Sequence, residues 1–232
     1  MLRAVFQTRP ASLLVRGWRA HSTGPSVGCV FAHQTADIVG SAYSLENIPP
    51  LQSLPEVAVT GRANVGKSTL LNAVMGRNGL VRTSKKAGHT RSLNFYRVGP
   101  GMGQLVLVDA PGYGPRGRPE WGALWDHYVQ TRTQLRRIYC LVNAKHGVEE
   151  TDKLVLADLH EKCLSAGGTR WTFQAVVTKV DLLPTARLRG ELAKIRQDVW
   201  EAAPTCLPPL ITGRERFGVE EVRKSIVEAC GV

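Results

Sequence analysis

Residues 61–68 have the residue types and spacing of a loop that binds the phosphates of a nucleotide. They fit the pattern GxxxxGK[ST], directly after an apolar run and at the start of a helical pattern. Glycines let successive backbone amides point at phosphate oxygens, and the helix N-terminus adds its positive end. We expect Lys67 to reach the β- and γ-phosphates and the Ser68 hydroxyl to bind Mg²⁺. The predicted phosphate-binding residues are Gly61, Arg62, Ala63, Asn64, Val65, Gly66, Lys67, Ser68 and Thr69.

A second candidate is the run Leu-Val-Asp-Ala-Pro-Gly at 107–112. In nucleoside triphosphatases an acid at this point holds Mg²⁺, and the glycine amide contacts the γ-phosphate. These roles fall on Asp109 and Gly112. Taken alone, the motif is equally well explained as an ordinary turn at the end of a strand. Because it follows a phosphate-binding loop and ends another apolar run, it favours the nucleotide interpretation.

The third candidate is Thr-Lys-Val-Asp at 178–181, after the apolar run 173–177. Asp181 could accept hydrogen bonds from N1–H and the 2-amino group of guanine, whereas adenine has neither donor. A carboxylate facing adenine would be desolvated and unpaired, which gives strong discrimination. The stem of Lys179 is expected along the base plane, and Thr178 precedes it. Together the three motifs predict GTP or GDP as the ligand.

The elements that must position these motifs alternate between short apolar runs and helical patterns. We therefore predict an α/β fold, the P-loop NTPase G domain, with a mostly parallel six-stranded sheet, one antiparallel edge strand and helices on both faces. The glycine-rich segment 99–103 indicates a hairpin. Expected strands are 56–60, 93–98, 104–108, 138–142, 173–177 and 207–211. Expected helices are 66–76, 119–136, 151–165, 185–201 and 218–229.

The 232 residues carry 30 Lys+Arg against 19 Asp+Glu, a formal charge of +11. No apolar run approaches the roughly 20 residues that span a bilayer. Five scattered cysteines argue against a disulfide framework or a zinc site.

Residues 1–25 hold four arginines and no acid among apolar residues, which is typical of a mitochondrial transit peptide; the alternative is a disordered basic tail. We expect residues 26–53 to be a linker or lead-in and residues 54–232 to form the G domain. We expect the protein to be located in the mitochondrial matrix.

With these motifs identified, the chain resembles the EngB-type GTPases, within the class that includes Era, TrmE and EngA. The resemblance covers residues 54–232. It is carried by GRANVGKSTLLNAV at 61–74, SKKAGHTRSLNFY at 84–96, LVDAPGYGPRG at 107–117 and VVTKVDLLP at 176–184.

The resemblance implies that Thr90, with Gly88 and His89 beside it, belongs to the first switch, and that Asp109 belongs to the second. Ser68, Thr90 and Asp109 would then complete the Mg²⁺ shell. In the related class the P-loop asparagine, here Asn64, binds a potassium ion. The implied catalytic group is Lys67, Asn64, Thr90 and Gly112.

Two departures from better-known GTPases bear on the chemistry. Tyr113 stands where Ras-like enzymes have a glutamine that orients the attacking water. We therefore expect slow GTP hydrolysis, stimulated by K⁺. The loop that closes over guanine lacks the usual Ser-Ala or Ser-Ser pair. Thr212 and Gly213 are the best candidates, with their backbone amides contacting the base.

Charge distribution suggests a target for the switch. Eight basic residues and no acid lie between Val57 and Val108. RNA phosphate is a natural counter-charge, although a solvated basic face is also compatible. Arg132, Arg136 and Arg137, at the end of the predicted helix 119–136, either extend this patch or are simply solvated.

Three functions are compatible with these motifs. The favoured one is a monomeric GTP-dependent switch in assembly of the mitochondrial large ribosomal subunit, acting on rRNA. The alternative is a GTP-responsive scaffold for proteins with negligible hydrolysis. A metabolic P-loop kinase is disfavoured because it would not need the Thr-Lys-Val-Asp motif.

Overall fold

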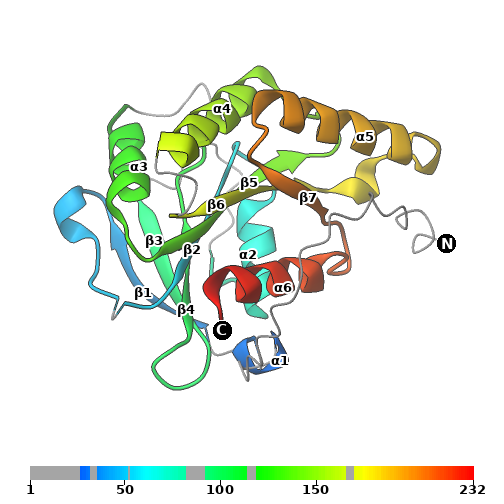
Figure 1. The fold of residues 1–232 in the computed structure, drawn as a ribbon. Coiled ribbons are helices and arrows are strands. Elements are labelled where there is room, and N and C mark those ends of the chain that lie inside the picture. Colours follow the sequence, from blue (N-terminus) through cyan, green and yellow to red (C-terminus); the bar gives the residue numbers. More distant parts are fainter. Residues whose placement is uncertain (1–26, 32–35, 52, 82–91, 114–118, 166–169) are drawn as a thin grey trace, which may run out of the picture.

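In the computed structural model, a seven-stranded sheet with strand order β1-β3-β4-β2-β5-β6-β7 crosses the whole domain (Figure 1). The structure describes residues 27–31, 36–51, 53–81, 92–113, 119–165 and 170–232. Strand β3 is antiparallel to both of its neighbours, β1 and β4, and all other neighbouring pairs are parallel. The strands are β1 (Ala36–Ala42), β2 (Glu56–Gly61), β3 (Leu93–Val98), β4 (Leu105–Asp109), β5 (Leu135–Asn143), β6 (Thr172–Thr178) and β7 (Leu207–Ile211).

The predicted fold class is confirmed, but the expected number of strands was wrong. The missed strand is β1, which lies in the stretch predicted to be a linker and forms the edge of the sheet. The antiparallel strand β3 is consequently internal. Only the two end residues of β1 are buried, while Ile38 and Val39 are exposed. Because β1 buries few side chains and pairs with β3 through its backbone, it lacks the continuous apolar run that marks central strands such as β2 and β4.

Helices cover both faces of the sheet, as predicted (Figure 1). Helices α3, α4 and α5 pack on one face, and α1, α2 and α6 pack on the other. Alternation along the strands fills both cores: Ala58 faces the first helix group, whereas Val57 and Val59 face the second. The helices are α1 (Val27–Val30), α2 (Lys67–Met75), α3 (Pro119–Thr131), α4 (Glu150–Ser165), α5 (Thr185–Ala202) and α6 (Val219–Cys230), with short 3₁₀ turns at Leu45–Asn47 and Val180–Leu182.

Helix α3 ends at Thr131, five residues before the expected end, and β5 begins at Leu135. The expected placement of Arg132, Arg136 and Arg137 on this helix was therefore wrong. Arg132 follows the helix and pairs with the buried Glu56, which also accepts a hydrogen bond from Tyr128. The two arginines of β5 sit on the sheet. Within the described part of the chain, no helix is long and apolar enough to cross a membrane.

Arg137 in β5 is buried under α6. Its guanidinium donates to Thr172 Oγ1 and to both the backbone oxygen and the hydroxyl of Ser225. This arginine anchors a helix to the sheet and is not available to a nucleic acid. Two aromatic residues of α3 pack against the core, since Tyr128 is fully buried and Trp125 stacks on it.

Candidate nucleotide-binding site

The three sequence motifs meet at one edge of the sheet, where the parallel strands β2, β4 and β6 end. Val59 of β2 is in register with Asp109 of β4, and Asn143 of β5 with Thr178 of β6. Loops that follow the carboxyl ends of parallel strands form the ligand site in open α/β sheets. The fold therefore brings the phosphate motif, the acid motif and the guanine motif together, although they are far apart in the chain.

The phosphate-binding loop is held by its own backbone and by a buried anchor. Val65, which is buried, donates from its amide to Arg62 O at 3.2 Å. Asn64 and Gly66 both have positive φ, 62° and 110°, and α2 begins directly afterwards at Lys67. The loop thus aims the N-terminus of α2, with its unpaired amides, at the site.

Lys67 and Asp109 form a buried ion pair in the centre of this site. They are only 8% and 2% exposed, respectively. Asp109 also acts on a neighbouring side chain: burial, and secondarily the Asp109 charge, raise the pKa of Tyr96 to about 12. The acid predicted to hold the metal and the lysine predicted to hold the phosphates therefore lie in direct contact.

The donor set fits a nucleotide carrying Mg²⁺. Asp109 offers carboxylate oxygens and Ser68, the second residue of α2, offers a hydroxyl, which are ligands that Mg²⁺ prefers. Among the described residues, no group of three His, Cys, Asp or Glu could hold a metal ion. A site with few protein ligands suits Mg²⁺, because this ion is commonly held by one or two protein oxygens together with substrate phosphates.

Gly112 lies against the phosphate-binding loop. A Cβ added at this position would be 3.2 Å from Gly61 O and 3.6 Å from Ala63 N. The next residue, Tyr113, forms a backbone bridge with Arg62. The second motif is thus docked on the first through its backbone, and this close approach favours a glycine, because a larger residue would push the two backbones apart by a few tenths of an ångström.

The guanine motif also contacts the phosphate-binding loop. Thr178 donates from Oγ1 to Val65 O at 2.6 Å, and Lys179 donates from Nζ to Asn64 O at 2.7 Å. Lys179 adopts a left-handed backbone conformation, with φ 58°. These two bonds join the motifs, so that the base site and the phosphate site form one rigid frame.

Asp181 faces the loop that was predicted to close over the base. A Cβ added at Gly213 would be 3.2 Å from Asp181 Oδ1. Arg214 approaches the same carboxylate twice, with its backbone amide 3.0 Å from Oδ1 and its Nε 3.2 Å from Oδ2. The sequence interpretation missed Arg214.

The amides of the closing loop are bonded within the protein. Thr212 donates from its amide to Val177 O, and Gly213 donates to Phe217 O. The Thr212 side chain is buried and also bonds to Val177 O. The loop lies beside Asp181, but these amides stabilise its own shape in this structure, and its contact with the base stays a prediction.

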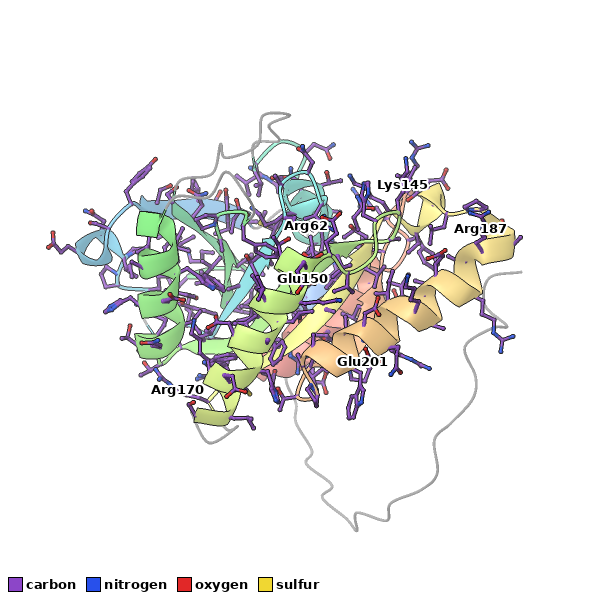
Figure 2. The ribbon with its side chains drawn as sticks, turned by 90° about the horizontal axis from the view of Figure 1, so that it is seen from above. Arg62, Lys145, Glu150, Arg170, Arg187 and Glu201 are labelled. Carbon is purple, nitrogen blue, oxygen red and sulfur yellow. The ribbon has the colours of Figure 1, made fainter. Side chains whose placement is uncertain are left out.

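A further group of site residues was missed because no short motif contains it. Asp152 in α4 accepts hydrogen bonds from Arg62 Nε at 3.0 Å and from Tyr113 OH at 2.9 Å. Arg62 additionally pairs with Glu149 and donates to Gly147 O. Figure 2 shows Arg62 close to the start of α4, where Glu150 begins the helix.

The first-switch residues Gly88, His89 and Thr90 lie outside the residues that the structure describes, and their roles stay predictions. The same holds for the basic residues Arg82, Lys85, Lys86 and Arg91. Of the other basic residues between Val57 and Val108, Arg62 and Lys67 are paired with carboxylates of the site.

Comparison with known proteins adds to this geometry. Residues 56–170 match the family model described as 50S ribosome-binding GTPase. A protein of Rhodopseudomonas palustris strain BisA53, named probable GTP-binding protein EngB, is 38% identical over 197 residues, covering 82% of this chain and 87% of its own. Its namesake from strain BisB18 is 39% identical over 201 residues, with the same coverage of both chains.

Among solved structures, the chain resembles that of Era in complex with MgGDPNP and nucleotides 1506–1542 of 16S ribosomal RNA. The TM-score is 0.56 at 22% identity, and the match covers 76% of this chain and 56% of Era. At this identity the likeness concerns the fold.

Proposed function

This chain belongs to the EngB family of P-loop GTPases, and we propose that it is a slow GTP-dependent switch in assembly of the large ribosomal subunit in mitochondria. The observation that carries the GTP-binding part of this proposal is the joining of the guanine motif to the phosphate-binding loop through Thr178 and Lys179. Base recognition and phosphate binding are thereby parts of one frame.

Within that frame each side chain has a distinct task. Lys67 neutralises phosphate charge, and Asp181 accepts from the donors of guanine that adenine lacks. Ser68 and Asp109, with Thr90 from the first switch, would hold Mg²⁺, which when bound neutralises charge on the phosphate oxygens. Since Lys67 and Asp109 pair with each other, binding of nucleotide and metal exchanges this ion pair for contacts with the ligand.

We attribute slow hydrolysis to Tyr113, the residue after Gly112. Tyr113 is held by Asp152 and cannot present an amide to a water molecule as glutamine does. A potassium ion bound by Asn64 would supply positive charge near the phosphates. The test is single-turnover hydrolysis in K⁺ and in Na⁺, with Asn64→Ala beside the unchanged chain. Faster turnover in K⁺ that disappears in Asn64→Ala supports the proposal; equal rates in both salts refute the K⁺ site.

The proposed target is rRNA of the large subunit. Support comes from the family description, 50S ribosome-binding GTPase, and from the formal charge of +11. The burial of Arg137 and the pairing of Arg132 remove these two arginines from the proposed RNA surface, which we place on the basic segment 85–97. We propose that GTP orders this segment through Thr90 and that hydrolysis releases the RNA.

Gradient sedimentation with mitochondrial ribosomal particles tests the target. We expect the chain to migrate with large-subunit particles when loaded with a non-hydrolysable GTP analogue, and not with GDP. Lys67→Met serves as the nucleotide-free control. Absence of co-migration in both states at low salt would favour the second candidate, a GTP-responsive protein scaffold, which the fixed Tyr113 also allows.

The proposed location has a separate test. We propose that residues 1–25 direct import into the mitochondrial matrix. A fluorescent reporter fused to these residues should accumulate in mitochondria, and replacing their four arginines by glutamine should abolish import. A reporter that stays in the cytosol would refute the transit peptide without affecting the GTPase assignment.

A further inference from the structure

We propose that Asp152 is a positioning residue of the GTPase site, which clamps the phosphate-binding loop and the residue after Gly112 to the start of α4. This inference rests on the GTPase activity and assigns a role to residues outside the three nucleotide motifs. It concerns one carboxylate and the groups that converge on it.

The Asp152 carboxylate is completely buried and fully used. Its side chain is 0% exposed. Oδ1 accepts from Arg62 Nε and Tyr113 OH, while Oδ2 lies 2.9 Å from Arg62 Nε and accepts from the amide of Glu149 at 3.0 Å. A buried carboxylate without such partners would be strongly unfavourable, so these contacts hold one another in place.

The donors come from three separate parts of the site. Arg62 belongs to the phosphate-binding loop, Tyr113 follows the second motif, and Glu149 precedes α4. Along the chain, Asp152 lies 90 residues from Arg62 and 39 residues from Tyr113. A side chain that only capped its own helix would need just the Glu149 amide. The two long-range contacts exceed what the helix requires and point to a role in the site.

Charge and protonation keep the clamp closed across the physiological pH range. The ion pairs with Asp152 and Glu149 outweigh burial and raise the pKa of Arg62. Burial first, and then the charge and hydrogen bond of Asp152, raise the pKa of Tyr113 well above its ordinary value. Tyr113 therefore stays protonated and donates its hydrogen bond, while Arg62 stays positive.

The clamp acts through Gly112. Because Tyr113 is fixed by its hydroxyl and by its backbone bridge to Arg62, the preceding Gly112 amide is held against the loop at Gly61. That amide is the predicted contact of the γ-phosphate, which GTP has and GDP lacks. Opening the clamp should therefore weaken hydrolysis and recognition of the third phosphate more than binding of GDP.

The experiment measures three quantities on the full chain: the GDP dissociation constant, the affinity ratio of a non-hydrolysable GTP analogue to GDP, and single-turnover hydrolysis. Tyr113→Phe deletes one hydroxyl, and Asp152→Asn removes the charge at constant size. Tyr43→Phe and Asp158→Asn make the same changes on exposed side chains, the latter within α4.

We expect each clamp variant to lower hydrolysis and the affinity ratio about tenfold, with GDP binding changed less than threefold. The double variant should lose no more than the more severe single variant, because both changes break one interaction. Both control variants should match the unchanged chain.

Unchanged hydrolysis and an unchanged affinity ratio in Tyr113→Phe would overturn the proposal. Equal losses of GDP and GTP-analogue affinity would also overturn it, since they indicate general damage to the loop. If Asp152→Asn does not fold, Tyr113→Phe decides alone. The affinity ratio tests the clamp even if the unchanged chain hydrolyses no GTP. Absence of hydrolysis in the unchanged chain would count against the GTPase assignment and not against the clamp.

Discussion

The phosphate end and the base end of this nucleotide site are built from charged groups in different surroundings. At the phosphate end, Lys67 pairs with Asp109 and Arg62 with Asp152, and both carboxylates are buried. At the base end, Asp181 pairs with Arg214, whose side chain is 81% exposed. Ion pairs are strong where water is excluded and weak where it screens them. The phosphate end should therefore govern stability and catalysis, and the base end should govern which nucleotide binds and for how long.

The largest effect is expected for Lys67→Met. It removes the phosphate contact and leaves Asp109 buried without its partner, so nucleotide affinity should fall on the order of 100-fold or more and stability by about 3–5 kcal/mol. Fluorescent-nucleotide titration and denaturant unfolding measure the two effects. Adding Asp109→Asn should restore much of the stability but no binding. If the double variant is no more stable than Lys67→Met, the buried pair is not the cause.

A large change confined to specificity is expected for Asp181→Asn. The new amide can still accept from N1–H through its oxygen, but its NH2 group faces the 2-amino group of guanine donor to donor. The same NH2 group can donate to the 2-oxygen of xanthine, so preference should shift from GTP towards xanthosine triphosphate by at least about 100-fold. Hydrolysis of bound xanthosine triphosphate should proceed at the usual rate. Competition binding with both nucleotides checks this, and unchanged GTP affinity would contradict the base-site assignment.

Gly112→Ala should produce an intermediate effect at the phosphate end. The added Cβ would lie 3.2 Å from Gly61 O, so either the loop or the second motif must shift. We expect hydrolysis to fall about tenfold with GDP binding largely kept. Single-turnover assays beside Gly122→Ala, where an added Cβ meets nothing within 4 Å, separate this close approach from a general effect of alanine. Normal turnover in Gly112→Ala would mean that the two backbones are less tightly docked.

The smallest effect is expected for Arg214→Ala. The Arg214 guanidinium pairs with the Asp181 carboxylate that is proposed to bind guanine, so removing the side chain should slow nucleotide dissociation. Because the pair is exposed, we expect only about a threefold change. Stopped-flow release of a fluorescent GDP measures it, with Arg216→Ala from the same loop as the control. Faster release would show that Arg214 binds the nucleotide instead of competing with it.

Much of the fold could be predicted because its signals are local. Five of the predicted helices and six of the predicted strands are present, since each has its own apolar periodicity or flanking glycine. The exceptions are also local in origin. Strand β1 is exposed over most of its length and therefore carries no strong apolar pattern. The boundary between α3 and β5 was missed because the residues that join them, including Arg132, contain no glycine or proline that would mark the end of the helix.

The amino-acid sequence by itself determined the three nucleotide motifs and the strand ends that carry them. Each motif consists of a few consecutive residues whose chemistry does not depend on distant neighbours. Only the tertiary structure decided that Arg137 is buried, that Arg214 meets Asp181, and that Asp152 clamps Arg62 to Tyr113. These contacts join residues far apart in the chain, and they exist because strand order and register bring the strand ends and the start of α4 together.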